Sequence, residues 1–131
     1  MFYLRHGNGT QVFLLHGFCG SSAAWSGCFE ALAEKFDVIA PDWPGFGQSA
    51  DLAPYRSIEA FAAGLVELAD RLSIERFAVV GHSIGSFVAQ QLMVTYPHRV
   101  DAAVLYGAGL RVDDAVRFES TAQTIEQLRL I

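Results

Sequence analysis

One short stretch of the chain combines a serine and two glycines in a spacing suited to nucleophilic chemistry. Residues 81–85 read GHSIG, between an apolar run at 77–80 and a helical pattern at 84–96. A sharp strand-to-helix turn lifts the middle side chain clear of the sheet, and glycine fits where a side chain would meet backbone. The stretch therefore predicts Ser83 as a nucleophile at a helix N-terminus, where partial positive charge favours developing negative charge. The alternative is a tight turn with an ordinary serine.

A second candidate element, residues 16–21 with the sequence HGFCGS, also follows an apolar run, Val12–Leu15. A loop at this place can direct a backbone N–H toward the oxygen that becomes negative during acyl transfer. His16 has two interpretations: a general base for the serine, or a structural histidine that braces the loop through hydrogen bonds. We favour the bracing role. Where the nucleophile is a serine on such a strand-to-helix turn, the catalytic base comes later in the chain than both the serine and the acid, whereas His16 precedes Ser83.

Apolar runs alternate with helical patterns along the chain, which indicates βαβ units and a mostly parallel sheet, an α/β fold. An Asn-Gly turn at 8–9 is expected to join the first two runs as a hairpin. The expected strands are Phe2–Leu4, Val12–Leu15, Asp37–Ala40, Phe77–Val80 and Val100–Tyr106. The expected helices are Ala24–Lys35, Ile58–Leu72 and Ile84–Tyr96, with Ser21 or Ser22 and then Ser57 as N-caps of the first two.

The composition fits one domain or part of one: 131 residues, 52% hydrophobic and 18% charged, with a formal net charge of −5. The charges are scattered and Lys35 is the single lysine, so nucleic acid is not an expected partner. Residues 1–10 hold no apolar signal region and no run is long enough to cross a bilayer. We therefore expect a cytoplasmic protein that does not interact with a membrane.

Two cysteines and a glycine-rich loop are the other candidates for chemistry. Cys19 and Cys28 are too few for a disulfide framework or a four-ligand metal site, and free thiols are expected. Residues 45–50 match the dinucleotide pattern G-x-G-x-x-A, but Pro54 follows and no helical pattern begins before Ser57. A loop beside the site is the better interpretation. No set of His, Cys, Asp and Glu has metal-ligand spacing, so we expect no metal.

Four blocks of the sequence, in order and spacing, resemble the α/β-hydrolase superfamily, in its group of cap-bearing esterases, lactonases and carbon–carbon bond hydrolases. The resemblance implies an eight-stranded, mostly parallel sheet with helices on both faces, a serine–acid–histidine triad, an oxyanion hole and no cofactor. The blocks are His16-Gly17-Phe18 with Trp25, residues 42–49, Gly81-His82-Ser83-Ile84-Gly85, and residues 96–100.

The same resemblance assigns roles within the site. The two oxyanion donors would be the backbone N–H groups of Phe18 and Ile84. His16, Gly17, Gly81, His82 and Gly85 would support them. Relatives with an aspartate nucleophile, such as haloalkane dehalogenases and epoxide hydrolases, carry it at the position of Ser83, which disfavours their chemistry here.

The resemblance also sets domain boundaries. We expect residues 1–112 to form the N-terminal part of the hydrolase core, truncated after the sixth strand of the family, and residues 113–131 to begin a helical cap. Asp113 and Asp114 are interpreted as first-turn residues of a cap helix, and His98 as lying at the sheet edge opposite Ser83. The C-terminal half of the same protein is therefore the expected source of the triad acid and histidine.

The leading functional hypothesis is hydrolysis through an acyl-serine intermediate, with a small apolar ester, lactone, thioester or cleavable ketone as substrate. One alternative is a small-molecule receptor on a hydrolase scaffold with slow or no turnover. Another is an inactive fragment, and the 131-residue chain alone is expected to be inactive.

Overall fold

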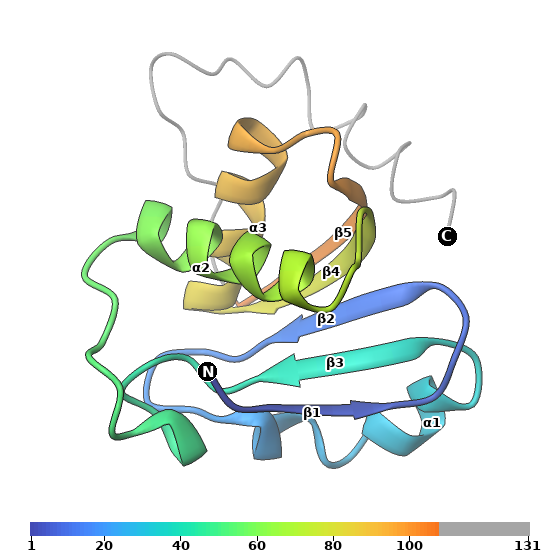
Figure 1. Ribbon diagram of the computed structural model, residues 1–131. Coiled ribbons are helices and arrows are strands. Elements are labelled where there is room, and N and C mark those ends of the chain that lie inside the picture. Colours follow the sequence, from blue (N-terminus) through green and yellow to red (C-terminus); the bar gives the residue numbers. More distant parts are fainter. Residues whose placement is uncertain (108–131) are drawn as a thin grey trace.

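The computed structural model describes residues 1–107, which form one five-stranded sheet in the order β1-β3-β2-β4-β5 (Figure 1). Four of the strands run parallel, and β1 is antiparallel to its neighbour β3. This confirms the expected mostly parallel sheet. The strands are β1 (Tyr3–His6), β2 (Gln11–Leu15), β3 (Asp37–Pro41), β4 (Phe77–His82) and β5 (Val100–Tyr106).

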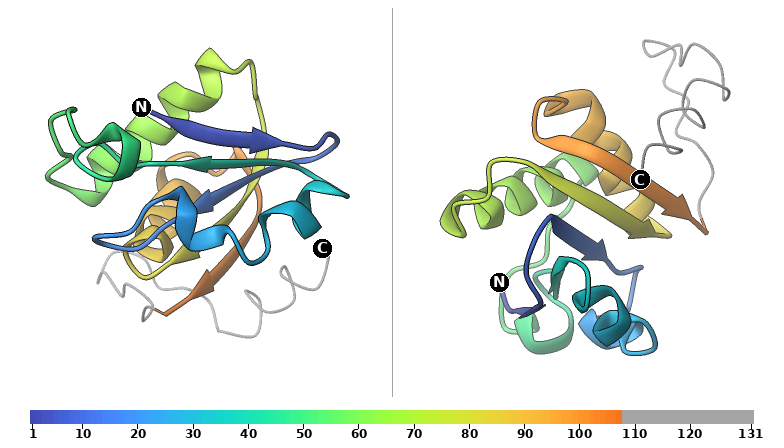
Figure 2. Two further views of the ribbon diagram at one scale, coloured as in Figure 1. Left: turned by 90° about the horizontal axis from the view of Figure 1, so that it is seen from below. Right: turned by 90° about the vertical axis from the view of Figure 1, so that its right-hand side faces the viewer.

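Helices cover both faces of the sheet (Figure 2). Side chains alternate between the faces of a strand, so Phe13 and Leu15 of β2 enter one core while Val12 and Leu14 enter another. The first core packs under α2 (Ile58–Arg71) and α3 (Ile84–Thr95). The second packs against the 3₁₀ turn η1 (Ser22–Trp25) and α1 (Phe29–Ala33). A further 3₁₀ turn, η2 (Gly47–Ser49), lies in the loop after β3.

The expected hairpin between the first two strands is wrong, because β3 lies between them. Tyr3 pairs with Pro41 and His6 with Val38, while β2 pairs with β3 on its other side. All of β3 is buried, which suits an inner strand, whereas β1 is mostly exposed, which suits an edge. A type I′ turn would also need positive φ at Asn8, which does not have it.

The other expected elements agree with the structure except for the first helix, which is two short pieces instead of one. Residues 26–28 separate η1 from α1, and Gly27 among them is unfavourable inside a helix. Ser21 Oγ accepts a hydrogen bond from Ala23 N–H at 3.3 Å, and Ser57 Oγ caps α2 at 3.2 Å. The expected cap region, 113–131, lies outside the described residues. Within residues 1–107, no helix has the length and apolar character needed to span a membrane.

A bidentate ion pair fixes the edge strand β1 to β3. Arg5 donates to both carboxylate oxygens of Asp37, at 2.9 Å from Nε and 2.7 Å from Nη2. The Asp37 side chain is 6% exposed and that of Arg5 is 39% exposed, so solvent screens the pair from the Arg5 side. The hydrogen bond from Arg5, helped by its charge and opposed by burial, holds the pKa of Asp37 below its ordinary value.

We expect Asp37→Asn to lower the free energy of unfolding by about 1–2 kcal/mol at pH 7, because a charge-assisted bidentate pair is lost. The folded-state pKa of Asp37 is depressed, so its contribution is present above the ordinary value of 3.8 and is lost as pH falls below it. Urea denaturation should show the two proteins converging in that acid range. Glu30→Gln is the matched control, since that carboxylate is 75% exposed; equal stabilities of Asp37→Asn and wild type at pH 7 would contradict the role.

Candidate active site

Ser83 lies between the last residue of β4 and the first residue of α3, with φ 53° and ψ −117°. Positive φ is uncommon for a residue with a side chain and costs about 1–3 kcal/mol, so it persists only where the surroundings impose it. The predicted strand-to-helix turn is therefore present, and it is sharp. Such strain is concentrated at functional sites, which makes Ser83 a candidate catalytic residue on geometry as well as motif.

Two glycines make this turn possible. A Cβ on Gly81 would lie 2.4 Å from the carbonyl oxygen of Gly85, and a Cβ on Gly85 would lie 2.2 Å from the carbonyl oxygen of Leu15. Both contacts are with backbone, which has little room to move. The end of β4, the first turn of α3 and the end of β2 therefore touch, and only glycine fits at either position.

The loop after β2 lies against this turn. A Cβ on Gly17 would be 3.2 Å from Ser83 Cβ and 3.0 Å from His82 Nδ1. Phe18 follows, 70% exposed, with its ring 5.4 Å from that of Phe46. Ile84 begins α3, so its N–H has no partner within the helix. The structure thus brings the two motifs of the sequence together at the carboxyl edge of the sheet.

His16 is completely buried, and both of its ring nitrogens have partners. Nε2 accepts a hydrogen bond from the Trp43 backbone N–H at 3.1 Å, so the proton is on Nδ1, which donates to the Gly17 carbonyl at 2.8 Å. Burial lowers the pKa of His16, opposed by the Gly17 bond and the charge of Asp42. A neutral ring engaged on both sides favours the bracing role over that of a general base.

The same bond orients the neighbouring peptide. The Gly17 carbonyl accepts from His16 Nδ1–H and also from Gly20 N–H, at 3.0 Å. In a planar trans peptide the C=O and the following N–H point in opposite directions. Two donors that fix the Gly17 carbonyl therefore fix the direction of the Phe18 N–H, the group predicted as an oxyanion donor.

Asp42, which the sequence reasoning did not single out, ties two loops of the site together. It is 1% exposed, and its carboxylate accepts from Ser22 N–H at 2.6 Å and from Gln48 N–H at 2.7 Å. The carboxylate fills the space beside Gly47, where a Cβ would be 2.2 Å from Oδ2. An anion there occupies part of the glycine-rich loop, which does not suit a bound pyrophosphate. The feature of the sequence that could have identified Asp42 is its position directly after a fully buried strand.

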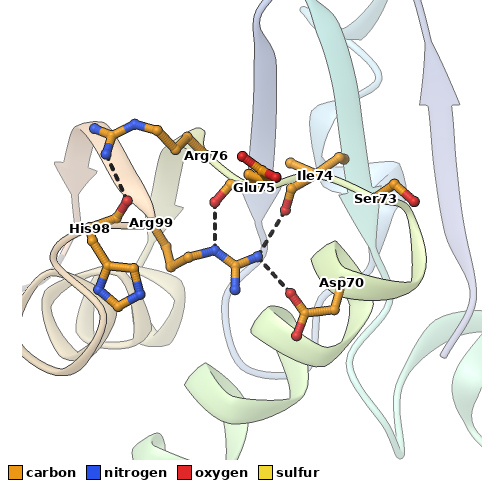
Figure 3. Close-up of a pocket in the computed structure, with 7 residues that line it drawn as sticks. All are labelled: Asp70, Ser73, Ile74, Glu75, Arg76, His98 and Arg99. Carbon is orange, nitrogen blue, oxygen red and sulfur yellow. Dashed lines mark hydrogen bonds and ion pairs between the residues drawn. The ribbon is translucent and has the colours of Figure 1, made fainter.

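His98 lies far from this site, at the amino ends of β4 and β5, as expected. It lines a pocket of about 500 Å³ with Arg99, whose guanidinium bonds Asp70 at 2.7 Å and the Ile74 carbonyl at 2.8 Å (Figure 3). Arg76 donates to the His98 carbonyl at 2.7 Å. Ser83 is at the carboxyl end of β4, at the opposite edge of the sheet, so this pocket is separate from the candidate site. The hydrogen bonds around the pocket hold the neighbouring loops together.

The remaining candidates for chemistry are the two thiols and metal ligands. Cys19 and Cys28 are both exposed and free. Cys19 has φ 58° in the loop after β2. Within the described part of the chain, no cluster of three or more His, Cys, Asp or Glu could hold a metal ion.

The family model of the alpha/beta hydrolase fold matches residues 10–129, and the chain belongs to this family. Over 103 residues, 79% of the chain, it is 42% identical to an uncharacterized protein of Mycobacterium tuberculosis. Over 118 residues, 89% of the chain, it is 33% identical to RutD of Azorhizobium caulinodans, named as a carbamate hydrolase. The matched regions are 30% and 44% of those two relatives, so the chain spans less than half of their length.

Solved structures show the same arrangement. Est816, described as an N-acyl homoserine lactone degrading enzyme, superposes with a TM-score of 0.79 at 30% identity, over 92% of this chain and 47% of that one. A protein of Pseudomonas aeruginosa described as an epoxide hydrolase gives a TM-score of 0.72 at 32% identity, over 79% of this chain and 36% of that one. The described residues therefore correspond to part of a larger fold.

We expect His16 to remain a neutral imidazole with its proton on Nδ1 at pH 7, because burial lowers its pKa below the ordinary 6.5. A group of this kind contributes stability above pH 6.5, and that contribution is lost as pH falls. Long-range ¹⁵N–¹H correlation spectra of the labelled protein should show the Nδ1–H tautomer. An imidazolium signal for His16 at pH 7 would contradict the bracing geometry.

Proposed function

We propose that Ser83 is the nucleophile of a hydrolase that works through an acyl-serine intermediate. The observation that carries the proposal is the backbone of Ser83, at φ 53° between β4 and α3. This conformation presents the hydroxyl at the carboxyl edge of the sheet and at the N-terminus of a helix. The adjoining loop with Gly17 and Phe18 supports it, because acyl transfer needs a donor beside the nucleophile.

In the proposed reaction, Ser83 Oγ attacks the substrate carbonyl carbon and its proton passes to a histidine from the C-terminal half of the protein. The carbonyl oxygen becomes an oxyanion that accepts hydrogen bonds from the N–H groups of Phe18 and Ile84. The carbonyl re-forms and the leaving group departs with the proton from the histidine. Water then adds to the acyl-serine through the same steps, which releases the acid and restores the Ser83 hydroxyl.

The proposed substrate is a small apolar ester, lactone, thioester or ketone with a cleavable carbon–carbon bond. The exposed ring of Phe18, edge-on to Phe46, offers an apolar surface beside the nucleophile. The names of RutD and Est816 give carbamate and lactone hydrolysis, both of which are acyl transfers. One structural neighbour is described as an epoxide hydrolase. The family resemblance implies an aspartate nucleophile for epoxide hydrolases at the position of Ser83, so the serine disfavours that reaction.

In the full-length protein, a fluorophosphonate probe should label Ser83 and no other serine, because the probe reacts with an exposed, activated hydroxyl. Ser83→Ala should abolish labelling and lower kcat on a nitrophenyl ester by several orders of magnitude, with folding retained. Ser26→Ala is the control, since Ser26 is exposed and caps η1 only through its backbone. Peptide mapping that places the label on Ser21, Ser49 or Ser86 would overturn the assignment, and labelling without turnover would favour a receptor.

The 131-residue chain alone should show no appreciable ester hydrolysis, because a neutral serine hydroxyl is a poor nucleophile at pH 7 without an adjacent base. The assay compares the purified chain, checked for folding by circular dichroism, with the same chain after addition of the C-terminal half. Activity that appears only with both halves would support a divided triad. Fast turnover by the chain alone, abolished by substitution of His16 or His98, would show that one of those histidines is the base.

A further inference from the structure

Ser86 is a buried serine that takes no part in the proposed reaction. It lies in the first turn of α3 and is completely inaccessible to solvent. Its hydroxyl oxygen lies 2.6 Å from the Gly81 carbonyl oxygen, 2.9 Å from the Tyr106 carbonyl oxygen and 3.2 Å from the Tyr106 nitrogen. One side chain therefore joins the end of β4, the start of α3 and the end of β5.

The hydrogen-bond capacity of the hydroxyl accounts for these contacts. A serine hydroxyl has one proton and two lone pairs, so it accepts from Tyr106 N–H and donates to one carbonyl at a time. The shorter distance, 2.6 Å, favours Gly81 as the acceptor. Without the hydroxyl, this junction would lose the side chain that bridges the ends of β4 and β5.

These bonds are continuous with those that hold the backbone of Ser83. Ser83 N–H donates to the Tyr106 carbonyl at 3.0 Å, and Ser86 N–H donates to the Ser83 carbonyl at 2.9 Å. The N–H of Ser83 is thus bonded to Tyr106, which the Ser86 hydroxyl also contacts, and the carbonyl of Ser83 is bonded to Ser86 itself. A strained conformation persists only where several contacts hold it. Around Ser83 these are backbone hydrogen bonds together with the bonds of the Ser86 hydroxyl.

We propose that Ser86 is a positioning residue, which sets the place of the Ser83 hydroxyl by locking the end of β5 to the turn. The inference rests on the proposed nucleophilic role of Ser83. An error of about 1 Å in the placement of a reacting group can cost roughly 10²-fold in rate. Ser86 is buried beneath the turn and does not reach substrate, so its loss acts on kcat and leaves KM nearly unchanged.

The experiment compares Ser86→Ala with Ser49→Ala in the full-length protein. Ser49 is a matched control, because it is 2% exposed and its Oγ accepts one backbone bond, from Phe2 N–H at 2.8 Å, away from the turn. Ser86→Ala should lower both kcat on a nitrophenyl ester and the rate of fluorophosphonate labelling by about 10–100-fold, with KM within about threefold. Ser49→Ala should change kcat by less than about threefold at a similar loss of thermal stability.

A second variant guards against a failure to fold. Ser86→Cys keeps nearly the same shape but donates only weakly, so it should fold and lower kcat in the same direction by a smaller factor. Wild-type kcat in Ser86→Cys together with a loss in Ser86→Ala no larger than in Ser49→Ala would overturn the positioning role. Unchanged labelling of Ser83 in Ser86→Ala would overturn it and leave the nucleophile intact. Absence of label on Ser83 in wild type would instead overturn the proposed function and this inference with it.

Discussion

A serine held at φ 53° between a strand and a helix needs close backbone contacts on every side, and much of the described structure meets that need. Gly81 and Gly85 allow β4, α3 and β2 to touch. The Tyr106 carbonyl at the end of β5 accepts a hydrogen bond from the Ser83 N–H. The Ser86 hydroxyl contacts the carbonyls of both Tyr106 and Gly81. The parallel order β2-β4-β5 makes these contacts possible, because adjacent parallel strands bring their carboxyl ends together.

Buried polar groups hold the loops around the turn. Trp43 donates two hydrogen bonds to His16, from its backbone N–H to Nε2 at 3.1 Å and from Nε1–H to the His16 carbonyl at 3.2 Å, and these connect the ends of β2 and β3. Asp42 connects the loops that follow those same strands. In a low-dielectric interior a satisfied polar network is rigid, whereas a broken one leaves costly unpaired groups. The loop with Phe18 is therefore held by side chains that are themselves buried.

The residues at the amino ends of the strands differ in kind from those at the carboxyl ends. At the amino edge, Arg99 and Arg76 fasten the loops before β4 and β5 to each other. At the carboxyl edge, the residues that could do chemistry meet. In open α/β sheets ligands bind at the carboxyl ends of the strands, so this division agrees with the proposed location of the site.

The sequence by itself determined the order of strands and helices, the cap at Ser57 and the turn at Ser83, because each is encoded within a few neighbouring residues. Only the tertiary structure decided that β1 pairs with β3, that Asp42 joins two loops and that Ser86 reaches Tyr106. Apart from the bond between Asp42 and Gln48, those partners are 20 or more residues apart. Their pairing depends on burial and on the hydrogen bonds left to satisfy once the sheet has formed, and no local periodicity carries that information.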